Sequence, residues 1–242
     1  MRSPHGTPNG LGERPRGTGL WLNTGQRPTG PQDRHFSYLG RVKTLLLGVV
    51  LAASGLQAGD PLDARTKGRP DAPVTVYEMA DFQCPACRQF AVNVFPTLER
   101  EFIEPGKVRW VFIHLPLTSI HPNAVAAAEV ATCAGRQGRF WRTHDLLYQL
   151  QDDWAKVAQP RAVLVSMARR AGVDRAKLLA CLDGGTARAE VERDAQRATR
   201  SGARGTPSFY IEGGLLQGAP STPDPMRRLL DSVYAVRTRP NQ

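Results

Sequence analysis

The sequence has few cysteines, few aromatic residues and no long apolar run, and each shortage excludes a class of protein. Four cysteines among 242 residues are too few for a small scaffold held together by disulfides. Aromatic residues make up only 7%, but the apolar fraction of 41% is enough to build a buried core. Because no run of about 18 apolar residues occurs, we expect no conventional transmembrane helix.

Signatures of several other functions are also missing. The chain contains no glycine-rich phosphate loop, no HExxH zinc motif and no nucleophile elbow, and we expect no cofactor. Of the formal net charge of +10, residues 1–58 carry seven Lys/Arg against two Asp/Glu. The remaining 25 basic and 20 acidic residues form no basic stripe interleaved with aromatics, so we expect no binding of nucleic acid.

The first 58 residues differ in composition from the rest of the chain. Residues 1–41 are rich in Gly, Pro, Thr and Arg without periodicity, which predicts a disordered extension that precedes a natural start at Val42. Residues 42–58, VKTLLLGVVLAASGLQA, place about ten apolar residues between a basic and a polar end, as in a secretory signal peptide. An uncut membrane anchor or a short buried helix is the alternative. Export to the periplasm or the extracellular space would put all four cysteines where disulfides persist.

Two of the cysteines lie at a predicted junction between a strand and a helix. Residues 74–79, VTVYEM, have the β-branched and aromatic character of a strand. After the turn that carries Cys84 and Cys87, apolar residues recur at three- and four-residue intervals, which predicts a helix over 85–104. Pro85 suits the first helical position, and Pro96 is expected to kink the helix.

This position favours redox chemistry. Free N–H groups and the positive end of the helix dipole stabilise a thiolate, so Cys84 is expected to have a lowered pKa and to be the attacking sulfur. Cys87, one turn along, is expected to be shielded but close enough to form a disulfide with it. A zinc half-site or a purely structural bridge is the alternative, but zinc needs further Cys or His ligands at suitable spacing, and we predict no metal site.

Several segments together resemble the DsbA-like branch of the thioredoxin superfamily. They are VTVYEMADFQCPAC around the two cysteines, residues 114–149, HLPLTSIHPNAVAAAEVATCAGRQGRFWRTHDLLYQ, and residues 205–219, GTPSFYIEGGLLQGA. The resemblance covers about residues 66–237. It implies an α/β thioredoxin fold in which a helical insertion, at about 120–202, separates a βαβ half from a C-terminal ββα half.

The resemblance also implies roles for residues outside the cysteine turn. Pro207 is expected to form a cis-proline loop facing the cysteines, with Thr206 turned outward to pair with an extended substrate; a trans proline is the alternative. Strand alternation points Glu78 inward, where the family keeps a buried acid that would act as general base toward Cys87. The alternative for Glu78 is an edge or solvent-facing position.

The other two cysteines, Cys133 and Cys181, have apolar neighbours and lie within the predicted insertion. In an exported chain, and because some family members have a second bridge, we expect a structural disulfide between them. Such a bridge would stabilise the fold by roughly 4 kcal/mol. Two buried free thiols are the alternative.

The resemblance implies an exported thiol–disulfide oxidoreductase. Its substrates would be unfolded or partly folded exported polypeptides, and a membrane quinone-linked thiol oxidase would reoxidise it. Ala86 adds no charge or donor to the Cys-Pro-x-Cys turn, and Thr206 resembles the residue found in thioredoxins and isomerases, so the direction of electron flow stays open. A disulfide reductase or isomerase is one alternative, and a copper-handling protein with a thioredoxin fold, using Cys84 and Cys87 as ligands, is another.

Overall fold

The computed structural model describes residues 62–239 of the chain. The predicted extension over 1–41 and the predicted signal peptide over 42–58 lie outside the described residues. None of the helices described between residues 62 and 239 has the length and apolar character needed to cross a membrane.

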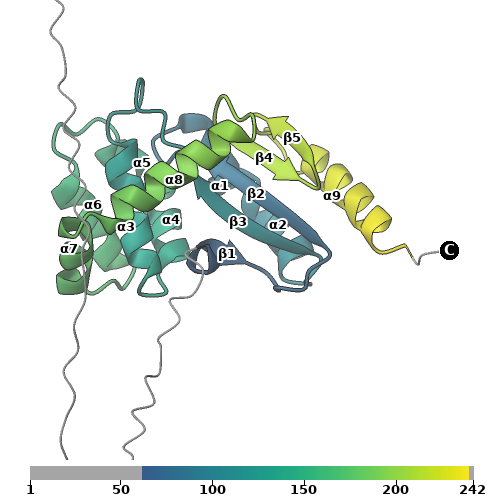
Figure 1. The fold of residues 1–242 in the computed structure, drawn as a ribbon, viewed down its shortest axis with the longest axis horizontal. Coiled ribbons are helices and arrows are strands. Elements are labelled where there is room, and N and C mark those ends of the chain that lie inside the picture. The colour runs from purple at the N-terminus through teal and green to yellow at the C-terminus, as the bar shows by residue number, and fades with distance from the viewer. Residues whose placement is uncertain (1–61, 240–242) are drawn as a thin grey trace, which may run out of the picture. The chain divides into compact units, whose positions relative to one another are not determined.

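A five-stranded mixed sheet lies at the centre of the described chain (Figure 1). Its order is β1-β3-β2-β4-β5, and the strands span Thr66–Lys67, Val74–Ala80, Val108–His114, Ser208–Ile211 and Gly214–Gln217 in chain order. The strand predicted over 74–79 is confirmed as β2, and it lies parallel to β3, as expected of the βαβ half. The other pairs are antiparallel. Strand β1 was not predicted, because two residues show no alternation.

The two faces of β2 bury different sets of residues. Val74 and Val76 pack with the helices that follow the cysteine turn and with the C-terminal helix α9, Asp224–Arg237. Tyr77 and Met79 contribute to a separate apolar cluster on the other face. Because side chains alternate along a strand, Glu78 belongs to the same face as the two valines, beneath the helix that carries the cysteines.

The helix predicted over 85–104 is divided into three parts. Helix α1 spans Pro85–Asn93, a short helix α2 spans Phe95–Leu98, and a π-helical turn, η2, spans Glu99–Ile103. Val94 interrupts the first two, with φ of −111°. Pro96 lacks an N–H and its ring excludes a regular helix at this point, so the predicted kink takes the form of a break.

Six helices form the predicted insertion between β3 and β4, as in the DsbA-like arrangement (Figure 1). They are α3 to α8, spanning Ala124–Gly135, Phe140–Gln149, Gln151–Trp154, Arg161–Arg170, Arg175–Asp183 and Thr186–Arg200. Their largest apolar cluster includes Cys84 and Cys87, so the insertion packs directly against the cysteine turn. A 3-10 turn, η1, Asp63–Arg65, precedes β1, and its Arg65 is buried against Glu190 and Asp194 of α8.

Candidate active site

The turn between β2 and α1 brings the two cysteines to the N-terminal end of α1. Cys84 is the N-cap residue and Pro85 the first helical residue. The Cys84 N–H donates to Asp81 O at 3.1 Å, and Arg88 N–H donates to Cys84 O at 3.1 Å, which fixes Cys84 at the start of the first turn. Both cysteines are free thiols, with Cys84 7% exposed and Cys87 fully buried.

Hydrogen bonds favour the anion at Cys84. The Cys87 thiol is the largest cause of a fall in the pKa of Cys84 from 9.0 to about 5. The Thr206 hydroxyl and the backbone N–H groups of Cys87 and Ala86 lower this pKa further, and burial opposes them. Burial first, and then Cys84, raises the pKa of Cys87 well above 9.0. At neutral pH the arrangement therefore favours a thiolate at Cys84 and a thiol at Cys87.

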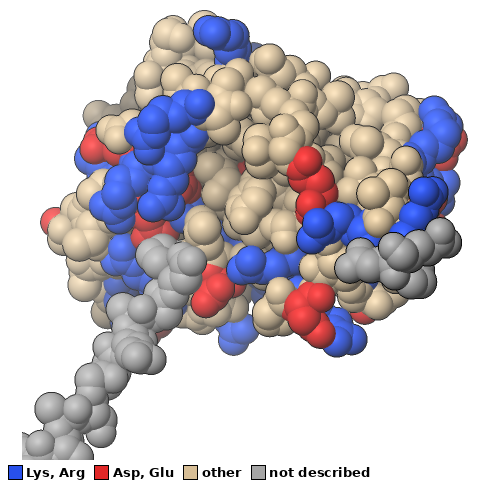
Figure 2. Space-filling model, turned by 45° about the vertical axis from the view of Figure 1, so that its right-hand side comes forward, with Lys and Arg blue, Asp and Glu red and all other residues tan. Residues whose placement is uncertain are grey.

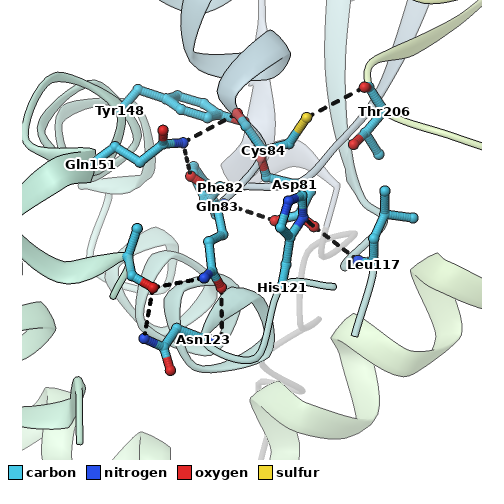
Figure 3. A network of polar contacts seen from close by, with 11 residues as sticks. Asp81, Phe82, Gln83, Cys84, Leu117, His121, Asn123, Tyr148, Gln151 and Thr206 are labelled. Atoms are coloured by element: carbon cyan, nitrogen blue, oxygen red, sulfur yellow. Dashed lines mark hydrogen bonds and ion pairs between the residues drawn. The ribbon is translucent and has the colours of Figure 1, made fainter. Parts of the chain in front are cut away.

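A loop containing a cis peptide bond faces Cys84 (Figure 3). The cis bond joins Thr206 to Pro207, and the Cys84 thiol donates to Thr206 O at 3.4 Å. The loop is held in place because Gly218 N–H donates to Pro207 O at 2.8 Å. The structure thus brings the predicted residues Thr206 and Pro207 against the attacking sulfur.

Glu78 is buried beneath this turn, with a relative exposure of 1%. Burial raises its pKa from 4.5 to about 7, and a hydrogen bond that it accepts from Trp110 Nε1 at 2.8 Å opposes this shift. The other carboxyl oxygen, Oε1, has no hydrogen-bond partner. Burial chiefly, followed by Cys87 and Glu78, raises the pKa of Tyr148. Cys87 and Glu78 therefore both lie close enough to the Tyr148 hydroxyl to affect its ionisation.

The buried carboxylate of Asp81 connects the cysteine turn to the loop after β3, and sequence analysis missed it. It accepts hydrogen bonds from Gln83 N–H at 2.7 Å and from Leu117 N–H at 2.8 Å (Figure 3). His121 Nδ1 lies 2.7 Å from the same oxygen that Leu117 contacts, and its side chain is 13% exposed. Two of these partners are backbone N–H groups, which leave no side-chain pattern in a sequence.

The helical insertion also holds the backbone of the turn. Gln151 Nε2, from α5, donates to Phe82 O at 2.7 Å and to Cys84 O at 3.1 Å. Tyr148, from α4, donates its hydroxyl to Asp81 O at 3.3 Å. Asp81 O and Cys84 O thus gain a second donor besides their backbone partners, and Phe82 O gains one from Gln151, so the insertion helps to define the conformation of the reactive turn.

Access to the turn is provided by a groove of about 880 Å³. Its lining includes Gln83 and Pro85, the two residues that flank Cys84, together with His121, Pro122 and residues of α5. The groove therefore opens beside the start of α1, on the side of the insertion.

The remaining two cysteines lie in the insertion and are joined to each other. Cys133, on α3, forms a disulfide with Cys181, on α7, across a Cα–Cα distance of 5.8 Å. Arg136 lies beside this bridge, with Nη1 3.3 Å from Cys181 Sγ. The structure does not bring this pair to the cysteine turn of α1. Within residues 62–239 no group of three or more His, Cys, Asp or Glu side chains is arranged to hold a metal ion.

Comparison with known proteins places this geometry in a family. A thioredoxin family model matches residues 62–232. The chain belongs to the thioredoxin family. A probable disulfide bond formation protein D of Bacillus anthracis is 33% identical over 152 residues, which cover 61% of this chain and 69% of that protein. Within the family, the chain is a DsbA-like thiol–disulfide oxidoreductase, as the sequence predicted.

Two further matches support narrower conclusions about this chain. The crystal structure of Wolbachia pipientis alpha-DsbA1 has a TM-score of 0.64 and 21% identity, and the match covers 72% of this chain and 92% of that chain. It supports the DsbA-like fold with its helical insertion. The Na(+)/H(+) antiporter NhaA 3 of Salinispora tropica is 34% identical over 181 residues, or 75% of this chain. The matched segment spans only 26% of the antiporter's length, so the similarity concerns one part of that protein.

Proposed function

We propose that this protein introduces disulfides into unfolded or partly folded exported polypeptides. The observation that carries the proposal is the unequal pair at the start of α1, in which the pKa of Cys84 falls to about 5 while that of Cys87 rises. A thiolate that is stabilised in the reduced form makes the corresponding disulfide a stronger oxidant. The signal-like segment 42–58 supports export, and a membrane quinone-linked thiol oxidase is the proposed source of reoxidation.

The proposed reaction has two exchange steps. A substrate thiolate attacks Cys84 Sγ of the Cys84–Cys87 disulfide, forming a mixed disulfide and releasing Cys87, which takes up a proton. A second substrate thiolate then attacks the substrate sulfur of the mixed disulfide and releases Cys84. The substrate loses two electrons and gains a disulfide, and the enzyme pair gains two electrons. Thr206 and Pro207 are proposed to hold the substrate backbone, in extended form, opposite Cys84.

The direction of this exchange is tested by mixing the oxidised protein with a reduced, unfolded secreted protein. We expect one substrate disulfide for each Cys84–Cys87 bond consumed, and a reduction potential in the range of about −120 to −180 mV. Ala86 gives the turn no hydrogen-bond donor and no charge, so we expect a potential at the less oxidising end of this range, about −180 mV. A potential near about −270 mV, with transfer of electrons to substrate disulfides, would instead identify a reductase.

Glu78 is proposed to act as general base toward Cys87. Because the pKa of Glu78 is about 7, the folded protein keeps the proton on the Glu78 carboxyl group while pH rises from 4.5 to about 7, whereas the unfolded chain loses that proton. The free energy of unfolding should therefore fall over this interval, by about 3 kcal/mol. We expect Glu78→Gln to abolish this fall and to slow thiol exchange above pH 7 on the order of 10²-fold.

Denaturant unfolding and stopped-flow exchange between pH 4 and 9 measure both effects. Glu129→Gln is the matched control, because this half-buried carboxylate of α3 pairs with Arg188 on α8. An exchange profile of Glu78→Gln that coincides with that of the unmodified protein would remove Glu78 from the mechanism.

A further inference from the structure

Helix α8 has both acidic and basic residues, and the fold buries two of its three acidic residues while all four of its arginines are exposed. Glu190 and Asp194 are buried and bind Arg65, which lies 129 positions from Asp194 in the sequence. The third acidic residue, Glu192, is exposed. The exposed arginines include Arg193, Arg197 and Arg200. A helix whose charges nearly balance in sequence therefore presents a strongly basic surface.

These three arginines form a row. Positions 193, 197 and 200 share one helix face, and Arg204 is exposed just beyond the helix end. None of the four guanidinium groups forms an ion pair or hydrogen bond with another residue in 62–239. Figure 2 shows a diagonal band of Lys and Arg side chains in the upper left of the view. From Arg193 to Arg200 the row extends about 10 Å along the helix axis.

The row runs toward the proposed substrate-binding loop. Thr206 follows Arg204 by two residues, so their Cα atoms are no more than about 7 Å apart. Thr206 O in turn accepts the hydrogen bond from Cys84 Sγ. A polypeptide whose cysteine reacts at Cys84 can therefore extend its neighbouring residues over the row.

An apolar pocket opens beside the row. It has a volume of about 220 Å³ and lies where α8 meets the sheet, with Tyr77, Met79, Ile113 and Tyr210 among its lining residues. Arg197 also lines this pocket. The surface thus combines positive charge with a space that fits a single aliphatic or aromatic side chain.

We propose that the α8 row and its pocket form a docking surface for acidic segments of the substrate polypeptide. The partner is a chain in which acidic residues and an apolar side chain neighbour the reacting cysteine. This inference rests on the proposed function, since the segment belongs to the molecule that is oxidised at Cys84. Charge complementarity would steer such substrates to the site and raise their association rate.

The surface fits a polypeptide better than a membrane. The exposed large apolar residues of the described chain are Val92, Ile120, Val157, Leu216 and Val236, and none of them lies on α8. The row thus has no apolar side chain beside it that would insert into a bilayer. An anionic membrane surface is retained as an alternative outcome of the test.

The test measures how fast the oxidised protein oxidises two-cysteine peptides. Acidic, neutral and basic peptides of equal length are compared at low salt, each with a phenylalanine or a serine at one fixed position. Each peptide loses two electrons and two protons to the Cys84–Cys87 disulfide, so no further oxidant is needed. We expect the acidic phenylalanine peptide to react about tenfold faster than the neutral one, and this advantage to shrink at higher salt.

Two triple variants locate the effect. Arg193→Gln, Arg197→Gln and Arg200→Gln together should remove the preference for acidic peptides. The matched control replaces Arg169, Arg170 and Arg175, three exposed arginines of α6 and α7, by glutamine. It removes the same charge elsewhere and should keep the preference.

The outcomes separate this inference from the proposed function. Equal rates for acidic and neutral peptides, or equal effects of the two triple variants, would overturn the docking surface. Equal rates for phenylalanine and serine peptides would overturn the role of the pocket. Failure to oxidise dithiothreitol, a small neutral dithiol, would instead contradict the proposed function. A different result would identify the row as a membrane-binding surface. In that case the unmodified protein would bind vesicles rich in anionic lipid, the α8 variant would not bind them, and the unmodified protein would show no preference among the peptides.

Discussion

Cys84→Ser and Cys87→Ser both abolish disulfide transfer, because neither variant can form the Cys84–Cys87 disulfide; these are the largest effects on activity that we expect. When reduced Cys87→Ser is mixed with a substrate disulfide, the Cys84 thiolate attacks one sulfur and releases the other as a thiolate, and the mixed disulfide accumulates because no Cys87 thiol remains to resolve it. With a pKa of about 5, Cys84 is thiolate in roughly 99% of reduced molecules at pH 7, and a serine hydroxyl has no comparable reactivity. We expect the transfer rate of Cys84→Ser to drop at least about 10³-fold. Non-reducing gels and mass spectrometry detect the trapped species in Cys87→Ser.

Replacing Cys87 by serine or by alanine tests whether the Cys87 thiol or the backbone N–H groups cause the low pKa of Cys84. The Cys87 thiol contributes the most to the fall in the pKa of Cys84. A serine hydroxyl can replace that donor, but alanine cannot. The pH dependence of Cys84 alkylation should therefore keep a low midpoint in Cys87→Ser and move to higher pH in Cys87→Ala. Equal midpoints in both variants would assign the effect to the backbone N–H groups instead, and a midpoint near 9 in the unmodified protein would contradict the mechanism as a whole.

The second large effect is on stability. Replacing Cys133 and Cys181 together by alanine removes a bridge between positions separated by 48 residues. Release of that loop constraint should lower the free energy of unfolding by about 4 kcal/mol. The corresponding fall in Tm is about 10 °C for a chain of this size. Thermal and denaturant unfolding, with the Cys84–Cys87 pair in the same redox state in both proteins, measure the difference.

This effect should be separable from catalysis. The bridge joins α3 to α7, whereas the reacting sulfurs lie at the N-terminal end of α1. At a temperature where both proteins are folded, the double alanine variant is expected to oxidise a small dithiol at the unmodified rate. A large loss of activity without a loss of stability would show that the bridge shapes the active site.

The sequence was sufficient to predict local features of this site. Strand alternation placed Glu78 inward, and the position of Pro85 located the start of the helix within one residue. Both depend on neighbours along the chain. The break at Val94 was predicted only as a kink, because a proline shows where a helix is disturbed but not how the chain continues.

Features that depend on distant partners could not be predicted in this way. The carboxylate of Asp81 meets Leu117 and His121, which follow it by 36 and 40 residues. The outward charge of α8 arises because Arg65 binds the acids on its inner face. In each case the pairing depends on tertiary packing, which a single sequence does not reveal.

The hydrogen bonds of Asp81 have a mechanical consequence for the reactive turn. One carboxylate holds Gln83, next to Cys84, and also Leu117 and His121 in the loop after β3. Ile120 in that loop is 67% exposed. A displacement of the loop must stretch bonds to the same carboxylate that orients the residue before the nucleophile. The same loop is tied to Gln83 a second time, because Asn123 N–H donates to Gln83 Oε1 at 2.7 Å. We therefore expect a partner that presses on Ile120 to change the alkylation rate of Cys84 through these two links.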